Sequence, residues 1–115
     1  MSIQNENVVL CGANSYSQKY YLNPEFEILP EQIKNELKIM CVLFTEDIGG
    51  IITLVFNRQG ELQFQVEAAD EDYLFDEIGC GLRIKKLQTD KSELLAGLQL
   101  FYQTSRKLKT NKPEQ

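Results

Sequence analysis

The clearest pattern along the chain is the alternation of apolar and polar residues between positions 61 and 67. The apolar residues are Leu62, Phe64 and Val66, and the polar ones are Glu61, Gln63, Gln65 and Glu67. A period of two is typical of a β-strand with one buried face and one face in water. The run 51–56 before it is rich in β-branched and aromatic residues, and Gly60 provides turn chemistry between the two. The pattern predicts an antiparallel hairpin over 51–67.

A helical period follows Pro30, a residue that fits the first turn of a helix. The apolar residues that share one face at i, i+4, i+7 and i+11 are Ile33, Leu37, Met40 and Phe44. The segment 39–45 also has high β propensity, so a shorter helix followed by a strand is the alternative. The helical interpretation over 30–46 is favoured, because the glycine pair at 49–50 provides a stop signal.

Two more helices are expected, near 70–86 and 90–107. Leu74, Ile78 and Leu82 recur at i, i+4 and i+8, which predicts an apolar face on the first of them. Glycines at 79 and 81 weaken a helix, so a short strand over 82–87 is the alternative there. For the second helix, Asp90 followed by Glu93 resembles a capping box.

The tyrosine-rich segment 15–23 predicts a further strand, paired back to 8–11. The polar ends, 1–7 and 110–115, are expected to be disordered, which leaves one domain over 8–109. A chain of 115 residues is long enough for one core and too short for two ordinary domains. The predicted fold is therefore a single α+β domain. An antiparallel sheet is built on the 51–67 hairpin, and helices near 30–46, 70–86 and 90–107 pack on one of its faces.

Composition removes several classes of function. The chain has no histidine, which excludes Ser-His-Asp and Cys-His catalysis, histidine-based metal sites and the usual pH switch near neutrality. Its three cysteines, at positions 11, 41 and 80, form no C-x-x-C pair and no disulfide framework. No apolar run is long enough for a secretory signal or a membrane span. We therefore expect a cytoplasmic protein that contacts no membrane.

Charge is unevenly placed along the chain, whose net charge is −5. Residues 1–81 carry 4 basic and 14 acidic side chains, whereas residues 82–115 carry 8 basic and 3 acidic ones. Such asymmetry is typical of segments that complement each other within a fold or across a dimer. Nucleic-acid binding is disfavoured, because the acidic part of the chain would repel phosphate. The basic residues that such binding would use are Arg83, Lys85, Lys86, Arg106, Lys107 and Lys109.

Six carboxylates crowd into residues 67–77, with no basic residue among them: Glu67, Asp70, Glu71, Asp72, Asp76 and Glu77. A calcium loop of the EF-hand type needs glycine at its sixth position and glutamate at its twelfth. Counted from Asp70 these positions hold Phe75 and Gly81, so that motif is absent. No phosphate-binding glycine loop accompanies the acids either. The favoured interpretation is the acidic start of the 70–86 helix, available as a recognition surface, with no metal and no cofactor.

Cys80 is the candidate nucleophile. Its neighbours Gly79 and Gly81 are small, and Arg83 and Lys85 follow closely, a setting that exposes a thiol and lowers its pKa. However, no histidine can act as its base, and isolated cysteines are often buried. A buried, close-packed thiol is therefore favoured over a catalytic one.

Three segments carry a resemblance to known proteins: LCGANSYSQKYYLN (10–23), LFTEDIGGIITLVF (43–56) and DEDYLFDEIGCGL (70–82). They are similar to an uncharacterised family of small bacterial proteins, from clostridia and related bacteria, defined by a domain of unknown function. The resemblance spans about residues 8–102. It implies a cytoplasmic protein without an established activity, and it transfers no catalytic residue.

The leading functional hypothesis is a small, non-enzymatic protein-interaction module that self-associates as a homodimer. It rests on the missing catalytic machinery, the complementary charges and the amphipathic helices. The residues expected at a partner surface are Asp72, Asp76, Glu77, Arg106 and Lys107. One alternative is a small-ligand-binding protein or a thiol/carboxylate enzyme that uses Cys80 and the nearby acids. Another is a nucleic-acid-associated regulator.

Overall fold

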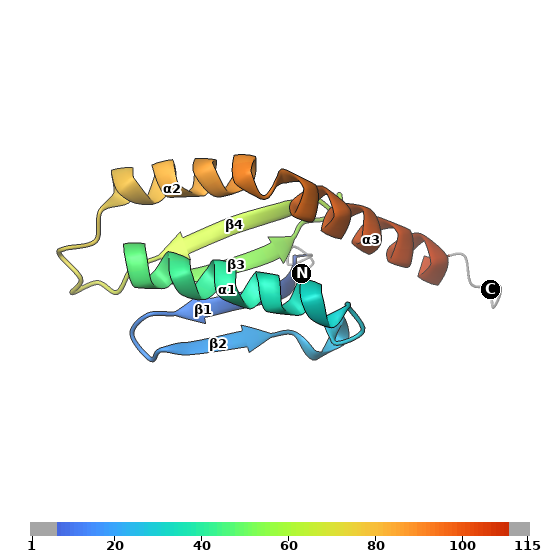
Figure 1. The fold of residues 1–115 in the computed structure, drawn as a ribbon, viewed down its shortest axis with the longest axis horizontal. Coiled ribbons are helices and arrows are strands. Elements are labelled where there is room, and N and C mark those ends of the chain that lie inside the picture. Colours follow the sequence, from blue (N-terminus) through green and yellow to red (C-terminus); the bar gives the residue numbers. More distant parts are fainter. Residues whose placement is uncertain (1–6, 111–115) are drawn as a thin grey trace, which may run out of the picture.

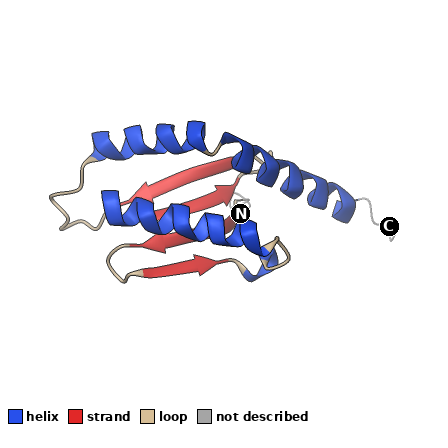
Figure 2. Ribbon diagram, in the orientation of Figure 1, coloured by secondary structure: helices blue, strands red, loops and turns tan. Residues whose placement is uncertain are grey.

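The computed structural model describes residues 7–110, which form one antiparallel sheet and three α-helices. The strands are β1 (Val8–Asn14), β2 (Lys19–Leu22), β3 (Ile51–Phe56) and β4 (Leu62–Glu67), in the order β2-β1-β3-β4. The helices α1 (Glu31–Ile48), α2 (Glu77–Asp90) and α3 (Ser92–Thr110) lie on one face of the sheet (Figure 1, Figure 2). The predicted α+β class is confirmed. The ends expected to be disordered lie almost wholly outside the described residues.

The hairpin predicted over 51–67 is confirmed as β3 and β4. The backbone N–H of Asn57 donates to the carbonyl oxygen of Glu61 at 2.9 Å and closes the turn. Gly60 takes a φ of 83° there, in the left-handed region that glycine adopts without strain. The side chains of β4 that pack against the core are Leu62, Phe64 and Val66, as the alternation predicted.

The predicted tyrosine-rich strand is β2, which pairs antiparallel with β1. Tyr21 lies opposite Gly12 and Tyr20 opposite Ala13. The turn lies between Asn14 and Lys19, so β1 continues three residues beyond its expected end. The reason is that β3 pairs with β1 along the whole of this length.

Helix α1 is continuous, so the segment 39–45 is helical, as favoured. Leu37, Cys41 and Phe44 are buried on its sheet side, and this burial outweighs the β propensity of the segment. The helix ends at Gly49, whose φ is 88° and whose N–H donates to the carbonyl oxygen of Thr45 at 2.9 Å.

The boundaries predicted for the second helix are wrong. Helix α2 begins at Glu77, not near Asp70, and runs on to Asp90, so the segment 82–87 is helical. Asp76 is its N-cap, and the Asp76 carboxylate accepts a hydrogen bond from the Gly79 N–H at 3.0 Å. Residues 70–75 form a loop with turns before it.

The predicted inner face of α2 is also wrong. Leu74, Ile78 and Leu82 are 94%, 77% and 65% exposed, whereas Cys80 and Leu87 are buried. Leu74 precedes the helix, so the apolar spacing that starts there does not describe one helical face. The side of α2 that carries Cys80 and Leu87 is buried instead, because it packs into the core with α1.

The third helix starts at Ser92, so the predicted capping box is wrong: Asp90 is the last residue of α2. Lys91 alone separates the two helices, and its N–H donates to the carbonyl oxygen of Leu87 at 2.8 Å. The predicted helix over 90–107 thus begins two residues later and continues to Thr110. Leu98 is buried on its inner side.

The hydrophobic core lies between the sheet and the helices. The largest side chains with no exposed surface are Phe44, Phe56, Leu10, Leu37, Ile52, Leu54, Cys11 and Cys41. The ring of Phe56 stacks on that of Tyr102, with centroids 4.1 Å apart and planes at 4°. Phe26, in the short 3-10 helix η1 (Pro24–Phe26), packs 5.7 Å from Phe56. These aromatic contacts join η1, β3 and α3.

Candidate functional site

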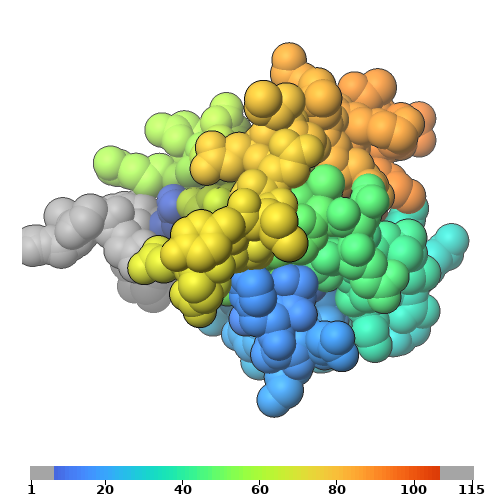
Figure 3. Space-filling model, turned by 90° about the vertical axis from the view of Figure 1, so that its left-hand side faces the viewer, coloured from blue at the N-terminus to red at the C-terminus, as the bar shows by residue number. Residues whose placement is uncertain are grey.

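The acidic loop before α2 is held against the turn between β1 and β2. The hydroxyl of Tyr16 donates to the Asp72 carboxylate at 2.6 Å and accepts from the Ala69 N–H at 3.0 Å. The bond to Asp72 raises the pKa of Tyr16. Figure 3 shows the two segments meeting, the turn in blue and the loop in yellow. Within residues 7–110, no three His, Cys, Asp or Glu side chains are placed to share a metal ion.

The residues predicted at a partner surface lie at opposite ends of the molecule (Figure 1). Asp72, Asp76 and Glu77 lie where α2 begins, whereas Arg106 lies near the end of α3. Arg106 donates to the carbonyl oxygen of Arg58 at 2.7 Å and lies over the Tyr102 ring. The side chain of Lys107 lies outside the described part. The structure therefore brings the three acids together but does not bring Arg106 to them.

Cys80 is buried, with 7% of its surface exposed, as favoured from the sequence. Burial raises the pKa of the Cys80 thiol, and the charges of Glu77 and Asp76 raise it further. Arg83, which was considered as a cation that would lower this pKa, instead pairs with Asp47 of α1. A protonated, covered thiol is a poor nucleophile, so the thiol-enzyme alternative finds no support here.

Two of the basic residues considered for nucleic-acid binding, Arg83 and Lys86, form intramolecular ion pairs, and so does the neighbouring Lys91. Lys86 pairs with Asp90 one turn later at 3.1 Å, and Arg83 is already bound by Asp47. Lys91 pairs with Glu36 of α1 at 3.4 Å. Such pairs reduce the charge available to phosphate, so they count against the nucleic-acid alternative.

The outer side of the helix pair α1–α2 carries large apolar side chains. The Arg83–Asp47 pair links α2 to α1, and Lys91, directly after α2, pairs with Glu36 of α1. On both helices, the side that points away from the buried residues carries large apolar side chains among charged ones. We call this surface the α1–α2 face; its residues, each at least half exposed, are Ile39, Leu43, Ile78 and Leu82. Exposed apolar side chains grouped in this way are typical of interaction sites.

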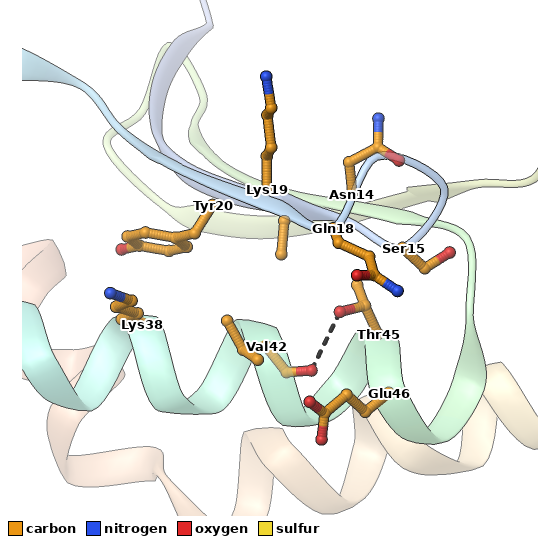
Figure 4. Close-up of a pocket in the computed structure, with 10 residues that line it drawn as sticks. Asn14, Ser15, Gln18, Lys19, Tyr20, Lys38, Val42, Thr45 and Glu46 are labelled. Atoms are coloured by element: carbon orange, nitrogen blue, oxygen red, sulfur yellow. Dashed lines mark hydrogen bonds between the residues drawn. The ribbon is translucent and has the colours of Figure 1, made fainter.

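A groove of about 760 Å³ runs between β2 and α1 (Figure 4). On the helix side it is lined by Lys38, Val42 and Glu46, which are spaced four residues apart and therefore share one face. On the strand side, Tyr20 lies toward Lys38, and Gln18 lies toward Glu46 (Figure 4). Neither Lys38 nor Glu46 has an ion pair with any residue of the described chain.

Behind the groove lies a buried polar cluster that the sequence did not predict. The sulfur atoms of Cys11 in β1 and Cys41 in α1 are 3.9 Å apart. The hydroxyl of Tyr20 is buried beside them and, among residues 7–110, has no hydrogen-bond partner at normal distance and angle. Burial raises the pKa of Tyr20 well above its ordinary value, and the charge of an ionised Cys11 would raise it further. Thirty residues separate the two cysteines in the sequence. Their contact could have been predicted only from the knowledge that Cys41 lies on the sheet side of α1 and that Cys11 lies in the strand below it.

Replacing Tyr20 with phenylalanine should stabilise the protein. A buried hydroxyl without a partner costs about 1–3 kcal/mol of folding free energy, and phenylalanine removes the hydroxyl while keeping the ring. We expect Tyr20→Phe to raise the free energy of unfolding by about 1 kcal/mol, measured by urea denaturation at pH 7. A loss of 1 kcal/mol or more would mean that the hydroxyl has a partner.

The same substitution should change the response to alkali. The native pKa of Tyr20 lies above that of the unfolded chain, so this contribution to stability is complete below about pH 10 and is lost as the pH rises further. Tyr20→Phe should make the fall in stability above pH 10 shallower. The pKa of Tyr16 is also raised, so part of the fall in stability above pH 10 should remain in the variant. Tyr21→Phe, at an exposed position, is the control and should leave the pH profile unchanged.

Comparison with known proteins gives a family without an assigned activity. Residues 7–110 match a family model described as a family of unknown function (DUF6145). No curated protein and no solved structure matches the chain. Among the described residues, no helix combines the length and the apolar character needed to cross a membrane.

Proposed function

We propose that this chain, which belongs to the family of unknown function DUF6145, is a cytoplasmic, non-enzymatic interaction module that associates with itself. The observation that carries the proposal is the α1–α2 face, where Ile78 and Leu82 are 77% and 65% exposed. Its apolar side chains lie on helices that the Arg83–Asp47 and Lys91–Glu36 pairs hold in place. A pre-ordered apolar surface loses little conformational entropy on binding.

The absence of an alternative chemistry within the described residues supports this proposal. Cys80 is covered and its pKa is raised, and the neighbouring acids cap α2 or bind Tyr16. All three cysteines are free thiols, which fits a reducing compartment such as the cytoplasm. A two-fold dimer is the simplest assembly, because it brings the same face of both copies into one contact.

Native mass spectrometry of untagged protein over a range of concentrations tests the proposal. We expect a species of twice 13.2 kDa that becomes more abundant as the concentration rises. Ile78→Asp should weaken the dimer at least about a hundredfold, because a two-fold contact buries the substituted position twice. Circular dichroism should show an unchanged fold, since the side chain is exposed.

Ile28→Asp is the matched control. Ile28 is 75% exposed, nearly the same as Ile78, but it lies just before α1 and outside the α1–α2 face. This variant should keep the dimer. A protein that stays monomeric at every concentration, or a dimer that tolerates Ile78→Asp as well as Ile28→Asp, would contradict the proposal.

A further inference from the structure

The two edges of the sheet differ in how they are covered. In an antiparallel pair of strands, every second residue bonds to the neighbouring strand. Asn57 and Glu61 form such a hydrogen-bonded pair, so the odd-numbered residues of β4 bond to β3. The backbone groups of the even-numbered residues of β4 therefore point away from β3. One of these outward groups, the N–H of Leu62, donates to the side-chain oxygen Oε1 of Gln99 in α3 at 2.8 Å. Helix α3 thus covers this part of the β4 edge.

The β2 edge is open. The N–H of Asn23 donates to the carbonyl oxygen of Leu10, so the odd-numbered residues of β2 bond to β1. The N–H and C=O groups of Tyr20 and Leu22 therefore point outward. No strand formed by residues 7–110 lies along that side. An open strand edge of this kind can pair with an extended segment of another chain.

The groove beside this edge carries a charge pattern. Lys38, Val42 and Glu46 follow one another along α1, so a cation, an apolar side chain and an anion face the groove in that order. Eight residues of helix place Lys38 and Glu46 about 12 Å apart along the axis. In an extended strand, residues i, i+2 and i+4 point to one face and span about 13 Å. The two spacings match.

We propose that this groove binds an extended segment of a protein partner, which adds to β2 as a fifth, antiparallel strand. The segment has the pattern acid, any residue, apolar, any residue, base. Its acidic side chain lies against Lys38, its apolar one on Val42 and its basic one against Glu46. The main chain pairs with the outward groups of Tyr20 and Leu22.

The order of the charges follows from the direction of β2. Figure 4 places Gln18 toward Glu46 and Tyr20 toward Lys38, so β2 runs from the Glu46 end of the groove to the Lys38 end. An antiparallel partner runs the opposite way, which places its acid first. On α1, Val42 and Glu46 lie one and two turns after Ile39, so this groove borders the α1–α2 face, and the test must separate peptide binding from self-association.

Fluorescence anisotropy with labelled synthetic peptides at low salt tests the proposal. The probe is acetyl-Thr-Asp-Thr-Val-Thr-Lys-Thr-amide, and the control is acetyl-Thr-Lys-Thr-Val-Thr-Asp-Thr-amide, which has the same composition with the charges exchanged. We expect the protein to bind the probe about tenfold more tightly than the control.

The double variant K38E/E46K, which changes two exposed side chains, should reverse this preference. N-methylation of the valine in the probe should weaken binding about tenfold, because it removes a main-chain donor.

Two results would overturn the proposal. One is equal affinity, or no binding, for the two peptides. The other is dissociation of the dimer by the probe, because that would assign the open edge of β2 to the contact between copies. Self-association is tested separately, by native mass spectrometry of the Ile78→Asp and Ile28→Asp variants. Failure of the peptide-binding proposal can therefore be told apart from failure of the dimer proposal.

Discussion

Replacing Phe56 with alanine should lower the free energy of unfolding by about 3–5 kcal/mol. Phe56 has no exposed surface, so the substitution leaves a cavity among side chains that cannot all move to fill it. Its ring also stacks on Tyr102 and packs against Phe26, contacts worth about 0.5–1.5 kcal/mol beyond the buried area. Urea denaturation followed by circular dichroism measures the loss.

The effect should reach α3, because Tyr102 belongs to that helix. We expect faster amide hydrogen exchange in α3 of the Phe56→Ala variant than in α1. Tyr73→Ala removes an exposed aromatic ring from the loop before α2 and should change stability by less than about 0.5 kcal/mol. A loss below about 1.5 kcal/mol for Phe56→Ala would show that the aromatic cluster does not hold the core together.

The second large effect concerns two glycines that should respond in opposite ways to the same substitution. A Cβ atom on Gly12, in β1, would lie 2.7 Å from the backbone oxygen of Ile52. The neighbouring strand would have to move, so Gly12→Ala should cost about 1–3 kcal/mol. A Cβ on Gly81, in α2, would meet nothing within 4 Å, and alanine is the better helix former there. Gly81→Ala should therefore stabilise by up to about 1 kcal/mol.

Thermal and urea denaturation of the two variants, side by side, measure this contrast. Gly97→Ala in α3 is a further control, because that position is also open, and it should behave like Gly81→Ala. A Gly12→Ala variant as stable as the unmodified protein would mean that the close approach of β1 and β3 at Gly12 is not tight.

Local patterns predicted the elements whose signal lies within the element itself. The 62–67 strand shows its own period of two, and Gly60 marks the turn before it, so the hairpin could be placed to the residue. For 39–45 both a helix and a strand were consistent with the local pattern, and the helix forms because Cys41 and Phe44 are then buried against the sheet. Tertiary packing, which no short window contains, decided that case.

The features that the sequence did not predict depend on distant neighbours. The i, i+4 spacing of Ile78 and Leu82 predicted the wrong inner face, because which face α2 buries is set by its contact with α1. Cys11 and Cys41 meet only because β1 and α1 stack, thirty residues apart along the chain. The groove likewise needs both β2 and α1, so no motif in one segment could indicate it.

The unequal edges of the sheet set a limit on how copies of this protein can aggregate. A β-sheet polymer grows only if each added molecule offers two open edges, one to receive and one to extend. Here Gln99 occupies the Leu62 amide of β4, whereas β2 remains open. Two molecules that joined through β2 would therefore present to a third only their β4 edges, in which α3 already occupies the Leu62 amide. Edge-to-edge assembly should therefore be disfavoured beyond a pair, although β2 contains neither a proline nor a bulge.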